Sequence, residues 1–133
     1  MANNIKTALD ILKDEVHGDV EAALKKMHPD YAMTWVNYSF DRLFRRVSRK
    51  DSGFGKLIAS AYAIKGRKYD IKHIVANDDT VMIELIESYE SYVTPLVLVL
   101  EFKNGKIIRG RHYYDPQVSE MELSKKQVNK IYK

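Results

Sequence analysis

The sequence predicts an α+β domain, in which a curved antiparallel sheet of four to six strands is covered by three N-terminal helices that enclose a cone-shaped pocket. Two patterns predict this class. Apolar residues recur at helical spacing in the first half of the chain, whereas the second half consists of β-prone runs separated by turn residues. Helices followed by a meander of strands are typical of an α+β layer fold. A length of 133 residues fits one such domain.

Two helices are predicted before the first strand. Leu9 and Leu12 lie on the apolar face of a helix expected over 4–16, and Gly18 ends it. A second helix is expected over 20–27, because its apolar residues keep the same spacing.

The middle of the chain combines a strand, a basic stretch and a third helix. Residues 31–36 are aromatic and β-prone, so we expect a short strand there. Residues 40–47 are predicted to form one or two helical turns. The apolar stripe between Phe54 and Tyr62 predicts the third helix.

The second half of the chain is predicted to be a meander of strands. Asn104-Gly105, flanked by apolar runs, is the strongest turn signal and predicts a two-residue hairpin. Pro95 is expected in a connection, and Pro116 is expected to end the last strand. The predicted strands span 69–76, 80–88, 96–102 and 106–114.

Residues 1–116 are therefore predicted to form the α+β domain, and 117–133 a polar tail or short helix. The chain has no cysteine, which excludes disulfides, thiolate metal sites and a cysteine nucleophile. No apolar run is long enough for a signal peptide or a membrane span, so we expect a cytoplasmic protein without membrane contact. The net charge of +4 permits an anionic partner without requiring one.

The run Phe-Lys-Asn-Gly-Lys-Ile-Ile-Arg-Gly-Arg-His-Tyr-Tyr-Asp at 102–115, together with the order of elements over about 4–115, resembles the nuclear transport factor 2-like superfamily, nearest its SnoaL-like branch. The superfamily includes polyketide cyclases, limonene epoxide hydrolases, ketosteroid isomerases and pocket proteins without a reaction. The resemblance implies a small-molecule ligand and a homodimer formed through the sheet. Fold membership alone does not fix a function.

The resemblance also selects His112 and Glu87 as catalytic candidates. His112 stands where the cyclases and epoxide hydrolases have an acid-base Asp, and a histidine can exchange protons near neutral pH. Leu85 and Glu87 match an Arg and an Asp of the epoxide hydrolases, and Trp35 matches the Asp base of the isomerases. An inward Glu87 beside His112 would orient the ring and raise its pKa. The alternatives are a structural histidine on the sheet surface and a solvated glutamate at a strand end.

Which face of the last strand lines the pocket stays open. A regular hairpin puts Ile107, Arg111 and Tyr113 on one face and His112 on the other. A bulge at Gly110 would reverse this parity and bring Ile107 and His112 to the same side. Without a bulge, Arg111 and Tyr113 are the rival substrate-binding pair.

Aromatic residues near the first strand are predicted to form a pocket wall that binds substrate. Tyr31, Trp35 and Tyr38 do not fit simple alternation together, so we expect a kink, and tyrosine hydroxyls could donate to a developing oxyanion. Ordinary core packing of these aromatics is the alternative.

The basic segment 42–50 has two interpretations. It could form a lid that attracts an anionic ligand, or it could be a solvated basic face. No nucleic-acid motif accompanies it, so no nucleic-acid partner is expected. The histidines lack metal-ligand spacing and no phosphate-binding glycine motif occurs, so neither a metal nor a cofactor is expected.

These observations together predict a small-molecule pocket protein that acts as an acid-base isomerase, cyclase or hydrolase on an apolar or anionic molecule. The alternative is a non-catalytic ligand-binding or dimeric assembly domain.

Overall fold

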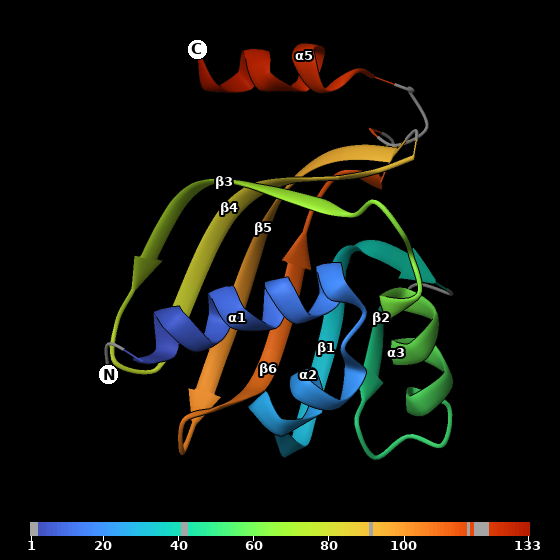
Figure 1. The fold of residues 1–133 in the computed structure, drawn as a ribbon, viewed down its shortest axis with the longest axis vertical. Coiled ribbons are helices and arrows are strands. Elements are labelled where there is room, and N and C mark those ends of the chain that lie inside the picture. The colour runs from blue at the N-terminus through green and yellow to red at the C-terminus, as the bar shows by residue number, and fades with distance from the viewer. Residues whose placement is uncertain (1–2, 41–42, 91, 117, 119–122) are drawn as a thin grey trace.

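The computed structural model describes residues 3–40, 43–90, 92–116, 118 and 123–133. Two helices precede two strands, and the remaining four strands follow a third helix (Figure 1). The elements are α1 (Asn3–His17), α2 (Val20–Lys26), β1 (Met27–Phe40), β2 (Leu43–Ser48), α3 (Phe54–Tyr62), β3 (Lys68–Ala76), β4 (Thr80–Tyr89), β5 (Tyr92–Lys103), β6 (Lys106–Tyr113), α5 (Lys125–Val128) and the 3-10 helix η1 (Asn129–Tyr132).

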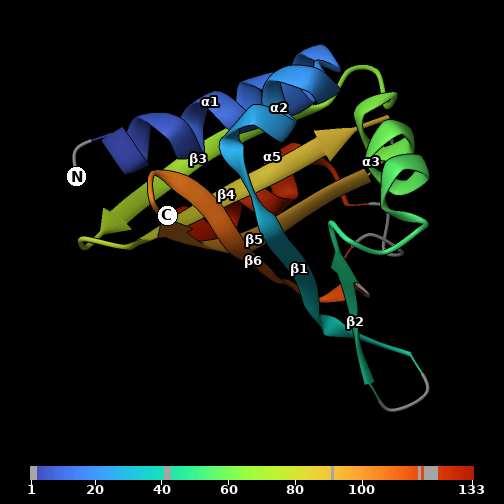
Figure 2. The ribbon, with the colours of Figure 1, turned by 90° about the horizontal axis from the view of Figure 1, so that it is seen from below.

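The strands form one curved, six-stranded sheet in the order β2-β1-β6-β5-β4-β3. Figure 2 shows α1 and α2 on one side of this sheet and α3 beside its far end. The predicted α+β class, the curved sheet and the three N-terminal helices are confirmed. The sheet is mixed, because β1 and β6 pair in parallel while the other pairs are antiparallel. No hairpin joins β1 to β6, so chain connection does not force them to run in opposite directions.

The core lies inside the curve of the sheet, under α1 and α3. Val81, Ile83 and Leu85 alternate along β4 and are completely buried, as expected for residues on the strand face that meets the helices. Ala8 and Leu12 of α1 pack into the same cluster. The helices therefore roof the concave face, and any cavity inside the domain must lie between them and the sheet.

Two local predictions were wrong. Residues 43–48 form strand β2 instead of helical turns, because β1 continues well beyond 31–36 and offers a partner edge on which Trp35 faces Arg45. Pro95 lies within β5, opposite Ile86, rather than in a connection. The tertiary pairing of long neighbouring strands thus outweighs local propensity at both places.

The hairpin between β5 and β6 fixes the orientation of the last strand. Asn104 and Gly105 both have positive φ angles, of 54° and 76°, as a two-residue turn of this kind requires. The register then shifts between the pairs Glu101–Arg109 and Phe102–Ile107. This irregularity lies just before Gly110 and reverses the parity of the strand as a bulge would.

The C-terminal helices pack against the sheet. Val128 of α5 is buried, and Lys72 Nζ on β3 donates a hydrogen bond to Asn129 Oδ1 at 2.8 Å. Ser124 caps α5 in a reciprocal box with Gln127. A short helix, α5, thus lies within 117–133, where a polar tail or short helix was predicted, and 119–122 lie outside the described residues. No helix in the described part of the chain is long and apolar enough to cross a membrane.

Candidate functional site

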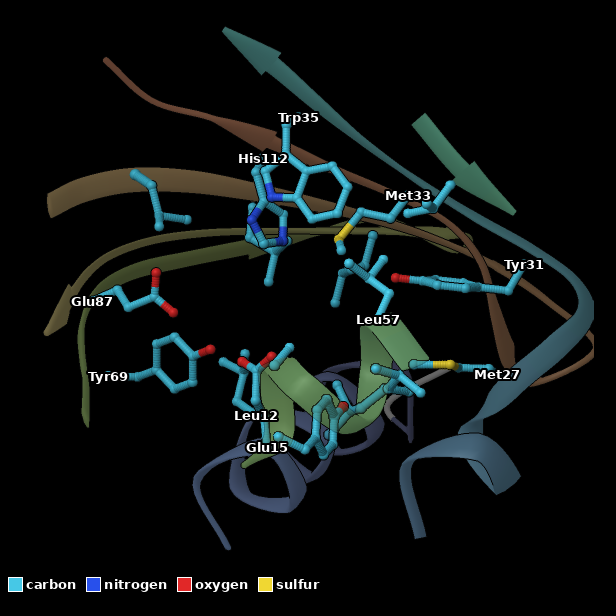
Figure 3. A pocket seen from close by; sticks show the side chains of 18 of the residues that line it. Leu12, Glu15, Met27, Tyr31, Met33, Trp35, Leu57, Tyr69, Glu87 and His112 are labelled. Atoms are coloured by element: carbon cyan, nitrogen blue, oxygen red, sulfur yellow. The ribbon is translucent and has the colours of Figure 1, made fainter. Parts of the chain in front are cut away.

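A cavity of about 120 Å³ lies inside the curve of the sheet. Its walls come from α1, α3 and the concave faces of the strands, and most of the lining side chains are apolar. Figure 3 shows Glu87 and His112 on the sheet side of the cavity and Leu12 and Glu15 on the helix side. The fold therefore encloses an apolar cavity that a few polar groups face, and its use as a small-molecule pocket stays a prediction.

The polar end of the pocket is built around a buried arginine. Arg67, the residue before β3, donates through Nη1 to Glu87 Oε2 and lies 3.8 Å from Glu15 Oε1. Its Nη2 donates to the carbonyl oxygen of Ala61 at 2.9 Å, which ties the guanidinium to the end of α3. The arginine side chain is only 7% exposed. One guanidinium thus fixes a carboxyl from α1 and a carboxyl from β4 at one place.

Arg67 affects the two carboxyls differently. Burial raises the pKa of Glu15 to about 7, with the charge of Glu87 adding to the rise and Arg67 opposing it, so Glu15 is partly protonated at neutral pH. Burial also raises the pKa of Glu87, but the charge of Arg67 and its direct hydrogen bond oppose this. Because a hydrogen bond to the charged form favours that form, the contact with Arg67 favours the carboxylate of Glu87.

Arg67 is held at some energetic cost. Its Nε is buried and has no hydrogen-bond partner among the described residues. An unsatisfied buried donor costs about 1–3 kcal/mol. The guanidinium also lies over the ring of Tyr89, 5.0 Å from the centroid, which offsets part of that cost.

His112 lines the pocket, but it is not paired with Glu87 as predicted. Burial and the charge of Arg67 lower the pKa of His112 to about 4, although part of its surface remains accessible. The predicted rise in this pKa is wrong, because the carboxylate of Glu87 is directed to Arg67. The histidine ring instead packs edge-on against Trp35, with 6.2 Å between centroids. His112 is therefore a neutral hydrogen-bonding group at neutral pH.

The alternative placement of Glu87 in solvent is also wrong. Its side chain is 10% exposed and its carboxyl faces the cavity (Figure 3). Glu87 is in register with Thr94, toward the end of β4, and follows the buried Leu85 on the same strand face. The alternation of residues along β4 therefore predicted correctly that Glu87 points toward the inside of the domain.

Two of the three predicted aromatic residues line the pocket. Tyr31 and Trp35 share one face of β1 with Met33, which also lines the cavity. A β-carbon added to Gly110 would lie 3.2 Å from the Tyr31 hydroxyl, so the glycine makes room for this ring against β6. The side chain of Tyr38 lies outside the described residues.

Arg111 and Tyr113 do not line this pocket. The register shift before Gly110 turns His112 inward and leaves these two residues on the other face of the sheet, where Arg111 forms an ion pair with Glu101 and Tyr113 is 39% exposed. The arginines of the basic segment 42–50 also differ in whether they reach the pocket wall. Arg45 stacks over Trp35 at the pocket wall, 5.0 Å from the ring centroid, whereas Arg49 donates to the carbonyl oxygen of Met27.

Arg67 and Glu15 were missed by the sequence analysis. For Glu15 a signal existed, because it follows Ile11 and Leu12 at helical spacing and so places a carboxyl on the buried face of α1. For Arg67 no pattern near Gly66 distinguishes it from the neighbouring Lys65 and Lys68. Among the described residues no group of three histidine, aspartate or glutamate side chains could hold a metal ion.

Comparison with solved structures identifies proteins of similar fold. An LEH-like epoxide hydrolase of M. tuberculosis superposes with a TM-score of 0.70 and 17% identity over 99% of this chain and 97% of that one. An NTF2-like protein of unknown function from Cytophaga hutchinsonii gives 0.67 and 11% identity, over 86% and 92%. This chain has a nuclear transport factor 2-like fold. The resemblance predicted from residues 102–115 is thus confirmed at the level of the fold.

The NTF2-like fold leaves the activity open. No family model and no curated protein matches the sequence. A de novo designed protein with a curved β-sheet is as similar in structure, with a TM-score of 0.68 and 17% identity over 92% of this chain and 93% of that one. Function must therefore be argued from the pocket.

Proposed function

We propose that this protein is a hydrolase that adds water to a small, neutral, apolar substrate such as an epoxide. The observation that carries the proposal is the arrangement of Glu15 and Glu87 around Arg67 at the polar end of an apolar pocket. Two carboxyls of different proton affinity are what a reaction needs when one group must accept a proton and another must donate one.

The lining and the charged groups of the pocket favour a small, neutral ligand. The pocket is mainly apolar, and the buried Arg67 beside its polar end is already paired with Glu87. A ligand anion would lie near two carboxyls, and the lining residues that the structure describes include no lysine or arginine, so a neutral molecule is favoured over the anionic one considered from the sequence. A cavity of about 150 Å³ in another protein holds benzene, so a volume of about 120 Å³ limits the ligand to a comparable size unless side chains move.

In the proposed reaction, Glu87 acts as the base and Glu15 as the acid. The carboxylate of Glu87 takes a proton from water while the water oxygen forms a bond to an epoxide carbon. The carbon–oxygen bond of the ring breaks, and the carboxyl of Glu15 gives its proton to the departing oxygen, which leaves a diol. Glu87 then carries the proton that Glu15 lost, and its return through solvent restores both groups. Arg67 stays charged throughout and holds the two carboxyls in place.

The other polar groups position the substrate in this proposal. Neutral His112 and the hydroxyl of Tyr31 face the cavity and can hydrogen-bond to substrate or water. Burial raises the pKa of Tyr31, so its hydroxyl stays protonated and can donate. Trp35 packs against the apolar body of the ligand.

Turnover of small apolar epoxides, measured as diol formation in the wild type and two variants, tests this function. Glu87→Gln and Glu15→Gln should each reduce turnover at least 100-fold, because each removes one proton transfer. Both variants should still bind a neutral diol analogue in a thermal-shift assay. Equal turnover by wild type and Glu87→Gln would contradict the proposal, as would binding without any turnover across the panel.

A second candidate is a non-catalytic binding or assembly domain. The observation that favours it is the size of the cavity, which is well below the roughly 300–1,000 Å³ usual for ligand pockets. Val75 and Met82 are also exposed on neighbouring strands, 62% and 45%, where a second copy of the sheet could pack. The homodimer stays a prediction, and a monomer by light scattering at high concentration would oppose it.

A further inference from the structure

A second hollow lies between α1 and the edge strand β3. It is an open groove of about 770 Å³, larger than the inner cavity. Leu12 and Tyr69 line both spaces and thus form the wall between them. The other residues that line the groove do not line the inner cavity, so a ligand in the groove would occupy a separate site.

The floor of the groove is apolar. Leu9, Leu12 and Val16 lie along one side of α1, and Ile71 faces them from β3. Val16 and Ile71 are each 37% exposed, which leaves apolar surface in contact with water on both sides of the groove. Apolar surface gathered in a concave space, unlike scattered single residues, is typical of a binding site.

The rim of the groove carries several positive charges. Lys13, Lys68 and Lys125 are exposed, and none of them forms an ion pair with another described residue. Asp70 is the one carboxylate among the residues that line the groove, and it pairs with Lys72 at 3.0 Å. The charge of Arg67, at the inner wall, is taken by Glu87.

We propose that this groove binds a single-chain fatty acid. The alkyl chain would lie along the apolar floor, and the carboxylate would lie among the lysines of the rim. A volume of about 770 Å³ is within the range of roughly 300–1,000 Å³ found for ligand sites. A groove enclosed by a helix and a strand fits one extended chain, whereas a membrane surface requires apolar groups that protrude.

The two sites take different chemical classes. The inner pocket presents two glutamates at its polar end and favours a neutral ligand, whereas the groove presents lysines around an apolar floor. The fatty-acid site therefore does not depend on the proposed hydrolase activity, and each can fail without the other.

The test uses laurate as the probe and calorimetry as the measurement. Lys13→Gln combined with Lys68→Gln should weaken laurate binding about tenfold, because two charge contacts at a partly exposed site are lost. Lys56→Gln combined with Lys103→Gln removes the same charge outside the groove and should leave the affinity unchanged. Dodecanol, which has the same chain without the carboxylate, should bind wild type about tenfold more weakly than laurate does.

Amide chemical shifts locate the bound chain. Laurate should perturb Lys13, Lys68 and Ile71 and leave Met33 and Leu57 of the inner pocket unchanged, in both the wild type and Glu87→Gln. Perturbation centred on Met33 and Leu57, or equal laurate affinity in the two double variants, would overturn the proposal. Binding to anionic lipid vesicles without binding of free laurate would overturn it in favour of a membrane surface.

Discussion

Arg67 donates a hydrogen bond to Glu87 inside the wall of the pocket, and this contact joins the start of β3 to β4. Both side chains are nearly buried, at 7% and 10% exposure. Removing one partner of such a pair leaves an uncompensated charge in a site of low dielectric, which costs far more than the pair itself contributes.

Replacing Arg67 with Met should destabilise the domain by about 3–5 kcal/mol, since Glu87 and Glu15 lose their shared cation. Urea denaturation gives the free energy of unfolding. The matched control is Arg111→Met, because Arg111 and Glu101 form an ion pair that is 33% and 41% exposed, and its loss should cost less than about 1 kcal/mol.

Combining Arg67→Met with Glu87→Met should recover most of the lost stability, because an apolar pair of similar volume needs no counter-charge. If the double variant is no more stable than Arg67→Met alone, the stability lost in Arg67→Met comes from packing. The electrostatic explanation of this contact is then wrong.

The stability that Glu15 contributes to the wild type should fall as the pH rises from about 4.5 to about 7, whereas the lowered pKa of His112, about 4, makes the contribution of that residue rise over part of the same range. Folding raises the pKa of Glu15 from 4.5 to about 7, so the folded protein holds this proton more tightly than the unfolded chain does. The stabilisation is complete below the unfolded pKa and is lost through the folded one, and it amounts to at most about 3 kcal/mol. Because His112 is present in both proteins, the stability of the wild type relative to Glu15→Gln should fall between pH 5 and pH 8, as measured by denaturation at these two pH values.

Gly110→Ala should narrow the pocket at Tyr31. The added β-carbon would lie 3.2 Å from the tyrosine hydroxyl, and Tyr31 is buried, so the ring must shift. We expect a loss of about 1 kcal/mol, the lower end of the range for overpacking. Tyr31→Phe in the same background removes the contacting oxygen and should restore part of the stability; equal thermal melting of the single and double variants would speak against this contact.

Much of the fold could be predicted because its signals are local. The spacing in α1, the turn at Asn104-Gly105 and the apolar alternation of β4 each depend on a few neighbouring residues. Strand β2 could not be predicted, because only its pairing with the extended β1 makes residues 43–48 a strand.

The candidate site was predicted only in part. Parity on β4 identified the inward face of Glu87, but its partner Arg67 lies 20 residues earlier, and no sequence pattern marks that contact. The direction of the His112 pKa depends on burial and on Arg67, which only the assembled fold brings near. Likewise, the register shift between Glu101 and Phe102 decides that His112, rather than Arg111, faces the pocket.

The measurement that tests the account most directly is a carbon-detected NMR titration of the glutamate side-chain carboxyls. Glu15 should titrate with a pKa of about 7, and burial should raise the pKa of Glu87 against the opposing charge and hydrogen bond of Arg67. In Arg67→Met the pKa of Glu87 should rise, because its hydrogen-bonding cation is gone. Titration of both wild-type carboxyls together near the usual glutamate value of about 4.3 would contradict the acid–base pair and the function proposed from it.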